Sequence, residues 1–215
     1  MAQEKRFVKE GIRSRDVEEF LEREFAKAGY SHSLIQRTPL SIRITVFAQK
    51  PGLIIGRGGK KIEAITQTLR EAFGFENPQL DVQEIENPDL DPHIVARRMA
   101  SSIERGINYK RVSHLALQRI MDAGAKGVAI RVSGKLSGEM SRTEKFNEGY
   151  LKYSGEPAES MVGKAYAVAN IKPGTIGIQV RIMKEAPKEL EVIKKVEEKE
   201  KLEGEEVGNI EEKTA

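Results

Sequence analysis

The sequence contains no cysteine and no tryptophan, and only 6% of its 215 residues are aromatic. Without cysteine, the chain can form neither a disulfide framework nor a metal site with thiolate ligands. No stretch approaches the roughly 20 apolar residues of a membrane-spanning helix, and the first six residues lack an apolar signal segment. We therefore expect a soluble intracellular protein without a membrane partner.

Charge is distributed unevenly along the chain. The net charge is only +3, but residues 97–145 carry 11 Lys/Arg against four Asp/Glu, a balance of +7. Residues 1–96 carry 14 against 15, and residues 188–215 carry six against ten. Phosphate is the natural counter-charge for such a basic stretch, so residues 97–145 are predicted to bind nucleic acid. The scarcity of aromatic residues argues against stacking of bases and for recognition of backbone and shape.

A glycine-rich turn with basic residues follows an apolar stretch at residues 52–55. Glycines at positions 56 and 59 remove the Cβ atoms that would hold a phosphate away, and they permit a tight turn between helices. A helix that begins near Lys60 would point its free N–H groups and positive dipole end at the same place. The candidate contacts with a nucleic-acid backbone are Gly56, Arg57, Gly58, Gly59, Lys60 and Lys61.

Three other interpretations of this turn are possible. A lone G-x-x-G is most often an ordinary turn. A phosphate-binding P-loop requires glycine where Ile54 stands and a hydroxyl where Lys61 stands, so that motif is absent. A dinucleotide fingerprint starting at Gly56 would also need glycine at residue 61. Apolar residues at helical spacing on both sides favour a pair of helices joined by a basic turn, which is the KH arrangement.

The hydrophobic pattern predicts an α+β fold in two domains with a charged tail. Residues 1–90 are predicted to form a type II KH domain, with the order helix, strand, strand, helix, helix, strand. Its first helix is expected from the N-cap Ser14 to Ala28, and its strands at 33–38, 41–49 and 79–86. Two prolines between residues 87 and 92 indicate the boundary.

Residues 91–187 are predicted to form a second α+β domain with two helices and a mainly antiparallel sheet. Asp91 and Pro92 begin a helix that runs to about Gly106, and a second helix covers residues 109–123. Strands are expected at 128–133, 141–146, 166–171 and 176–183, the last two as a hairpin. Residues 188–215 are rich in Glu and Lys and are expected to be disordered or partly helical.

Support for catalysis is weak. Asp89, Asp91 and His93 offer two carboxylates and an imidazole, but a helix start in a polar linker explains them better. His32 and His114 stand alone, and no serine has the context of a nucleophile. We therefore expect no enzyme activity, no cofactor, no metal site and no small-molecule substrate.

Basic residues recur through the second domain. On the helix after Asn108, Arg111 and His114 fall on one face with Lys110 beside them, which is also the usual pattern of a solvated face. Other cations precede and follow this helix, some of them around a glycine-punctuated loop at residues 133–138. The predicted RNA contacts are Arg97, Arg98, Arg105, Lys126, Arg131, Lys135, Arg142 and Lys145.

Two strings of residues resemble a known family. The helix-first order around Gly-Arg-Gly-Gly at 56–59 is similar to the type II KH domain. The string Gly-Ala-Lys-Gly at 124–127, continued by Arg-Val-Ser-Gly-Lys-Leu-Ser-Gly at 131–138 and Arg-Thr-Glu at 142–144, resembles the second domain of small-subunit ribosomal protein three. The resemblance covers roughly residues 16–183, and the charged tail is more similar to the archaeal and eukaryotic branch.

This resemblance implies a structural constituent of the head of the cytoplasmic small ribosomal subunit. It implies that the chain binds ribosomal RNA, contacts ribosomal proteins ten and fourteen, and lines the channel where messenger RNA enters. Lys110, Arg111 and His114 occupy the positions implicated in opening messenger RNA structure, although the bacterial pattern has Lys where His114 stands. A free-standing KH-domain regulator of messenger RNA, with the glycine turn as its main site, is the alternative.

Overall fold

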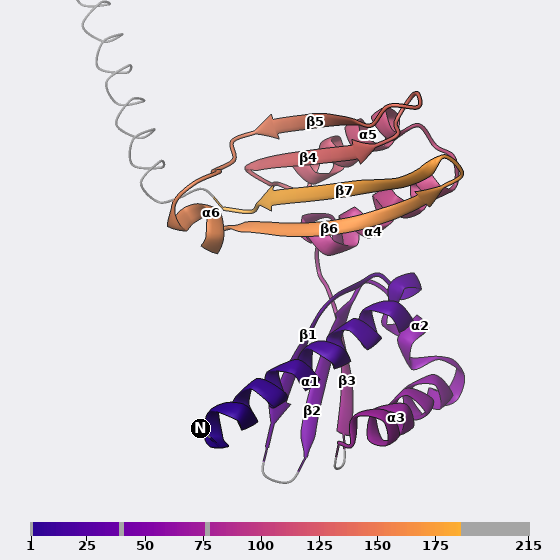
Figure 1. Cartoon of the computed structure of the whole chain (residues 1–215), viewed down its shortest axis with the longest axis vertical. Helices are drawn as coiled ribbons and strands as arrows, with labels where there is room; N and C mark the ends of the chain where they lie inside the picture. The colour runs from indigo at the N-terminus through magenta and orange to yellow at the C-terminus, as the bar shows by residue number, and fades with distance from the viewer. Residues whose placement is uncertain (1, 39–40, 76–77, 186–215) are drawn as a thin grey trace, which may run out of the picture.

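The protein is described by a computed structural model that covers residues 2–38, 41–75 and 78–185 (Figure 1). It has two α+β parts, each built on one β-sheet, and a short connection joins them. The predicted α+β class and two-part arrangement are therefore confirmed. The predicted tail, residues 188–215, lies outside the described residues. No helix in the described part of the chain is long and apolar enough to cross a membrane.

The N-terminal part has the predicted order of elements. These are α1 (Ala2–Glu24), the 3-10 turn η1 (Ala26–Ala28), β1 (Tyr30–Arg37), β2 (Ile42–Ala48), α2 (Pro51–Ile55), the 3-10 turn η2 (Arg57–Gly59), α3 (Lys60–Phe73) and β3 (Pro78–Glu84). β2 is the central strand of the sheet, antiparallel to β1 and parallel to β3. α1 packs on β1, and α3 packs on β3. The order and the helical layer match the predicted type II KH domain.

A small apolar core joins the helices of this part to its sheet. Leu21 and Phe25 follow each other by one helical turn, and both are fully buried against Ile44 and Val46 of β2 and Leu69 of α3. This packing fixes where α3 begins and therefore where the glycine turn before it lies.

The predicted bounds of the first helix were wrong. Ser14 was predicted to be its N-cap, but α1 begins at Ala2 and the Ser14 hydroxyl donates to the Glu10 carbonyl oxygen, one turn earlier in the same helix. Serine readily makes this bond inside a helix, so a capping residue in the sequence does not prove a cap. At the other end, α1 stops at Glu24 and residues 26–28 form the separate turn η1.

The C-terminal part contains a four-stranded antiparallel sheet in the order β5-β4-β7-β6. Its elements are the 3-10 turn η3 (Pro88–Leu90), α4 (Pro92–Glu104), α5 (Tyr109–Asp122), β4 (Gly127–Gly134), β5 (Arg142–Gly149), α6 (Glu156–Ser160), β6 (Val162–Ile171) and β7 (Gly174–Met183). The short helix α6 was not predicted, and β6 begins earlier than expected. The hairpin between β6 and β7 is confirmed, with its turn at residues 172–173.

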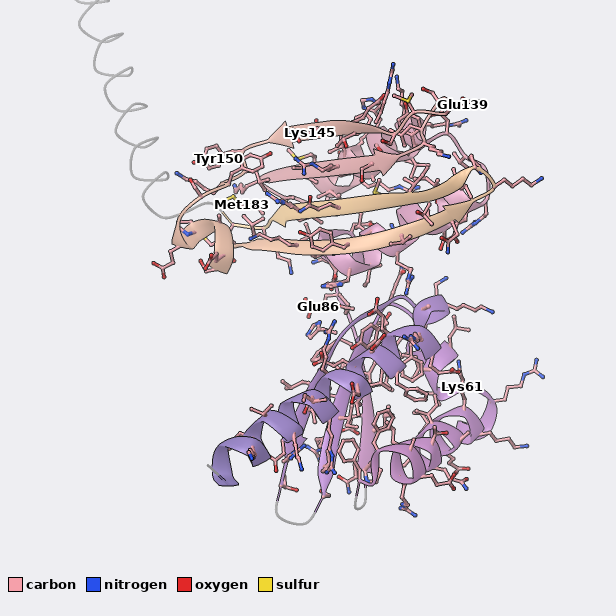
Figure 2. All side chains as sticks on the ribbon, in the orientation of Figure 1. Lys61, Glu86, Glu139, Lys145, Tyr150 and Met183 are labelled. Atoms are coloured by element: carbon pink, nitrogen blue, oxygen red, sulfur yellow. The ribbon has the colours of Figure 1, made fainter. Side chains whose placement is uncertain are left out.

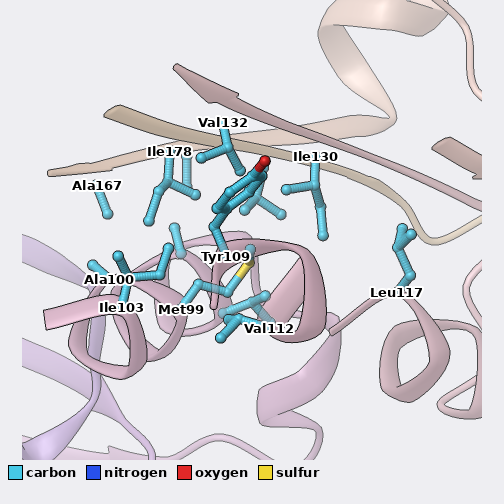
Figure 3. Packing of buried hydrophobic residues seen from close by; sticks show 14 of the residues in the cluster. Met99, Ala100, Ile103, Tyr109, Val112, Leu117, Ile130, Val132, Ala167 and Ile178 are labelled. Atoms are coloured by element: carbon cyan, nitrogen blue, oxygen red, sulfur yellow. The ribbon is translucent and has the colours of Figure 1, made fainter. Parts of the chain in front are cut away.

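Both long helices of this part cover the same face of the sheet. Figure 1 shows α4 and α5 behind the four strands, and neither of these two helices lies on the opposite face; the short helix α6 packs at the end of β6. Alternate residues of β4 and β7, such as Ile130 and Ile178, are buried against Met99 of α4 and Tyr109 of α5 (Figure 3). Because side chains alternate across a strand, the residues between them point to the open face.

The connection between the two parts is held by polar contacts. Asp91 is the predicted N-cap of α4, and its carboxylate accepts a hydrogen bond from the His93 N–H at 2.9 Å. The same carboxylate accepts from the hydroxyl of Ser31, a buried residue of β1. Asp89 pairs with the Arg98 guanidinium. Both carboxylates of the connection therefore have structural partners.

Candidate nucleic-acid interface

The glycine turn has the backbone that its sequence predicts. Gly56 (φ 73°, ψ −177°), Gly58 (φ 63°, ψ 26°) and Gly59 (φ 77°, ψ −1°) all adopt positive φ angles, which glycine tolerates and other residues rarely do. A Cβ on Gly56 would lie 2.8 Å from the Cβ of Lys61, whereas one on Gly58 or Gly59 would meet open space. Gly56 therefore shapes the turn, and the other two leave room in front of it.

The cations of this turn do not all face solvent. Arg57 and Lys60 are exposed, and α3 begins at Lys60 as predicted. Lys61 is half-buried: its ammonium lies 3.5 Å from the Leu53 carbonyl oxygen and 5.8 Å from the centre of the Phe25 ring. Arg57 and Lys60 are thus the side chains of this turn that are best placed to meet a phosphate, while Lys61 also braces α2 against α3.

The three candidate residues of α5 divide between two sides of the helix. Lys110 and His114 face β5, since the Lys110 ammonium lies 3.9 Å from Glu144 Oε1 and the His114 ring packs edge-on against Phe146 at 5.2 Å. Arg111 instead lines a groove of about 320 Å³ between α5 and α4. Successive helical residues are 100° apart, so Lys110 and Arg111 cannot point the same way. All three side chains are exposed.

Arg97, Arg98 and Arg105 come together in a cleft between the two parts. They line a hollow of about 280 Å³ with Lys27 and Lys50 from the N-terminal part. Arg97 lies 3.6 Å from Glu22 and Arg98 pairs with Asp89, so two of the three arginines already have carboxylate partners. The Arg105 Nε donates to the Ser101 carbonyl oxygen at 3.2 Å, which leaves the rest of its guanidinium available to a ligand.

The remaining predicted contacts fall in three places on the C-terminal sheet. Arg131 and Lys145 are direct partners on β4 and β5 and lie on the open face. Lys135 and Arg142 flank the loop at one end of these strands, beside Gly134. Lys126 lies at the opposite end, where its backbone bonds to Met183 and Tyr150. The cations of the basic stretch 97–145 are therefore spread over several surfaces that face different directions.

Hydrogen bonds and stacking at the open face involve residues that the sequence analysis did not single out. Tyr153, Tyr166, Gln179 and Arg181 join Arg131 and Lys145 there. Lone tyrosines separated by many residues give no local motif. The alternation of β7, with the buried residues Ile178, Val180 and Ile182 around Gln179 and Arg181, was the only signal that these two side chains share a face.

Comparison with known proteins gives matches over both parts of the chain. Residues 16–90 match the KH domain family, and residues 99–182 match the family described as ribosomal protein S3, C-terminal domain. The small ribosomal subunit protein uS3 of Methanocaldococcus jannaschii is 51% identical over 181 residues, which are 84% of this chain and 87% of that protein. The uS3 protein of Methanococcus maripaludis strain C5 is 50% identical over 181 residues, covering 84% and 86%. That of Natronomonas pharaonis is 45% identical over 215 residues, covering 99% and 70%.

Proposed function

Because this chain belongs to the family of small ribosomal subunit protein uS3, we propose that it is a structural constituent of the small ribosomal subunit and binds ribosomal RNA. The observation that carries this proposal is the 51% sequence identity to an archaeal uS3 protein over 181 residues, which include both the KH part and the C-terminal part. A free-standing KH regulator would need only the first part to resemble its relatives. The predicted limits, with domains at residues 1–90 and 91–187, are retained as part of the proposal.

Ribosomal RNA is expected to meet the protein on more than one side. Arg105, with Lys27 and Lys50, offers cations in the cleft between the two parts. Arg57 and Lys60 offer cations at the glycine turn, beside the first free N–H groups of α3. Contacts of this kind neutralise phosphates and position the protein, and binding should weaken steeply with salt through counterion release.

The exposed side of α5 is proposed to line the channel where messenger RNA enters. Lys110 and Arg111 point to different sides of the helix, so together they present charge on two sides of its exposed surface. Cations fixed on a rigid helix can hold the phosphates of separated strands while the ribosome moves, without ATP and without a catalytic residue. The His114 ring packs edge-on against Phe146, so Lys110 and Arg111 are the main contacts proposed on this helix.

The neighbours proposed for this chain in the subunit head are ribosomal proteins ten and fourteen, and its location is the cytoplasm. Sedimentation tests the core of the proposal. The tagged chain should migrate with small subunits on a sucrose gradient of a cell extract, and it should stay with them at moderate salt. A chain that remains at the top of the gradient, bound to messenger RNA alone, would favour the regulator instead.

A further inference from the structure

The open face of the C-terminal sheet is basic and carries no acidic side chain in its strands. The register of the four strands aligns their residues in rows across this face, with one residue from each strand in a row. The outward residues are Thr143, Lys145 and Asn147 of β5, Ala129, Arg131 and Ser133 of β4, Thr175, Gly177, Gln179 and Arg181 of β7, and Lys164, Tyr166, Val168 and Asn170 of β6. Four of these are cations and none is a carboxylate.

Two tyrosines are held on this face by a chain of contacts. The Gln179 side-chain amide lies 2.9 Å from the Tyr166 hydroxyl. With its oxygen turned toward its donors, the same amide accepts from the Arg181 guanidinium at 3.0 Å. Arg181 in turn lies over the Tyr153 ring, 5.8 Å from its centre. Tyr166 and Tyr153 keep 68% and 59% of their surface exposed, so their positions are fixed while their rings stay accessible.

Cations stand beside these rings. Arg131 pairs with Gln179 on one side and with Lys145 on the other, and Arg181 pairs with Lys164. Within the described residues, no carboxylate oxygen lies within 4.0 Å of any of these four cations. Arg131, Lys145, Asn147, Tyr153 and Arg181 line a shallow hollow of about 330 Å³ (Figure 2, near Lys145).

We propose that this face binds an unpaired RNA strand, with bases stacked on Tyr153 and Tyr166 and phosphates held by Arg131, Lys145 and Arg181. Exposed aromatic rings next to cations suit single-stranded RNA, since every base offers a π-face and every linkage a phosphate. An acidic peptide would match the charge but would leave both rings without a stacking partner. The inference deepens the proposed function, on which it rests, by naming the form of RNA bound.

This surface is separate from the proposed messenger RNA contacts on α5. α5 packs on the buried face of the sheet, so Lys110 and Arg111 lie on the far side of a layer of core residues from Tyr166. The low aromatic content of the chain had predicted recognition without stacking. The proposal departs from that prediction at this one face, because the fold places Tyr153 and Tyr166 there although they are separated in sequence.

The test measures binding of the full chain to a fluorescent oligouridylate of about ten nucleotides, beside a duplex RNA of equal length. Replacing both rings (Tyr153→Ala with Tyr166→Ala) should weaken binding of the single strand by about tenfold for each ring and leave duplex binding unchanged. Replacing them by Phe keeps the stacking surface, so Y153F/Y166F should bind the single strand almost as well as the unchanged chain.

Charge is tested separately. Arg131→Gln with Lys145→Gln should reduce the slope of log K against log salt by about 1.4, since each phosphate contact on a single strand contributes about 0.7. The matched control, Lys5→Gln with Lys9→Gln on α1, removes two exposed cations away from the face and should leave the slope unchanged. Circular dichroism of every variant confirms that the fold is intact.

Three outcomes would overturn the inference. Equal losses on duplex and single strand would mean general electrostatic attraction, unchanged binding would mean that the face does not bind RNA, and tighter binding of polyglutamate would indicate a protein partner. Gradient sedimentation of the same variants separates the two proposals. If Y153A/Y166A binds the oligonucleotide normally while the chain migrates with small subunits, only this inference fails. If the unchanged chain does not migrate with them, the proposed function fails.

Discussion

Tyr109 donates its hydroxyl hydrogen to Glu144 Oε1 over 2.9 Å, which ties the first residue of α5 to the middle of β5. The same oxygen lies 3.9 Å from the Lys110 ammonium. Burial raises the pKa of the Tyr109 hydroxyl above 10.0, and the hydrogen bond and charge of Glu144 raise it further. One carboxylate therefore anchors the helix that presents the proposed messenger RNA contacts.

Replacing Tyr109 by Phe should make the protein less sensitive to alkali. Because the folded pKa lies above the unfolded value, the stability contributed by the protonated hydroxyl is fully present below pH 10 and is lost as pH rises through the raised pKa. The urea midpoint of the unchanged chain should therefore fall more steeply above pH 10 than that of Tyr109→Phe. Tyr150→Phe, which replaces a more exposed tyrosine, is the control and should behave like the unchanged chain. Parallel curves for all three proteins would contradict the prediction.

Replacing Gly56 by Ala should destabilise the KH part. The φ and ψ angles of 73° and −177° belong to a region that is essentially restricted to glycine, and a Cβ would meet Lys61 Cβ at 2.8 Å. We expect a loss of about 2 kcal/mol in the free energy of unfolding, measured by urea denaturation. Gly58→Asn is the matched control, since its φ and ψ of 63° and 26° suit asparagine and its Cβ would meet open space. Equal losses for both variants would mean that the crowding at Gly56 is unimportant.

Replacing both Lys110 and Arg111 by Ala should slow passage of the ribosome through messenger RNA hairpins severalfold and leave assembly of the subunit intact. The side chains lie on two sides of α5, so each single variant should cause only part of the loss. Translocation is timed on matched templates with and without a hairpin. Lys172→Ala with Lys184→Ala removes two exposed cations elsewhere in the same part of the chain and should have no effect. Equal rates for both double variants on hairpin templates would refute the role of α5.

Local patterns predicted the elements and their order, because hydrophobic spacing and capping residues act within one helix or strand. Asp91, Pro92 and Lys60 stand at helix starts as expected. The N-cap predicted at Ser14 was wrong because a serine side chain can also bond to the carbonyl oxygen one turn earlier in a helix. The separation of Arg111 from Lys110 follows from helix geometry alone and was predictable.

Contacts between segments that are distant in sequence could not be predicted from one sequence. No local sequence pattern indicates that Tyr153 lies beside Arg181, or that Ser31 of β1 bonds to Asp91 at the start of α4. Strand order and register decide these contacts, and the alternation of a strand gives its faces but not its neighbours. For the same reason, the charge count of residues 97–145 predicted a basic stretch but not that its cations lie on several surfaces.

Replacing Arg57 and Gly58 by Asp should weaken, but not abolish, binding of the full chain to small-subunit ribosomal RNA. Two negative charges at the glycine turn repel phosphate there, while the cations of the cleft and of the C-terminal sheet remain. Aspartate tolerates the left-handed conformation of Gly58, so the fold should persist. Filter binding over a salt series measures the remaining affinity, with Gly58→Asn alone as the uncharged control. Complete loss of binding would make the turn the main site and favour the free-standing regulator.

The hydrogen bond between Ser31 and Asp91 should couple the two parts of the chain. Asp91→Ala removes both this bond and the cap on the His93 N–H, and should lower the free energy of unfolding by about 2 kcal/mol, of which the cap contributes about 1. Asn108→Ala is the matched control, because Asn108 caps α5 on the Lys110 N–H without contacting the N-terminal part, and it should cost about 1 kcal/mol.

Ser31→Ala completes a double-mutant cycle with Asp91→Ala, measured by urea denaturation. Because either replacement removes the same bond between the Ser31 hydroxyl and the Asp91 carboxylate, the two losses should overlap by about 1 kcal/mol. Ser31→Ala with Asn108→Ala should instead give losses that add, since these two residues lie in different parts and share no contact. Additive losses in both cycles would show that this bond does not couple the two parts.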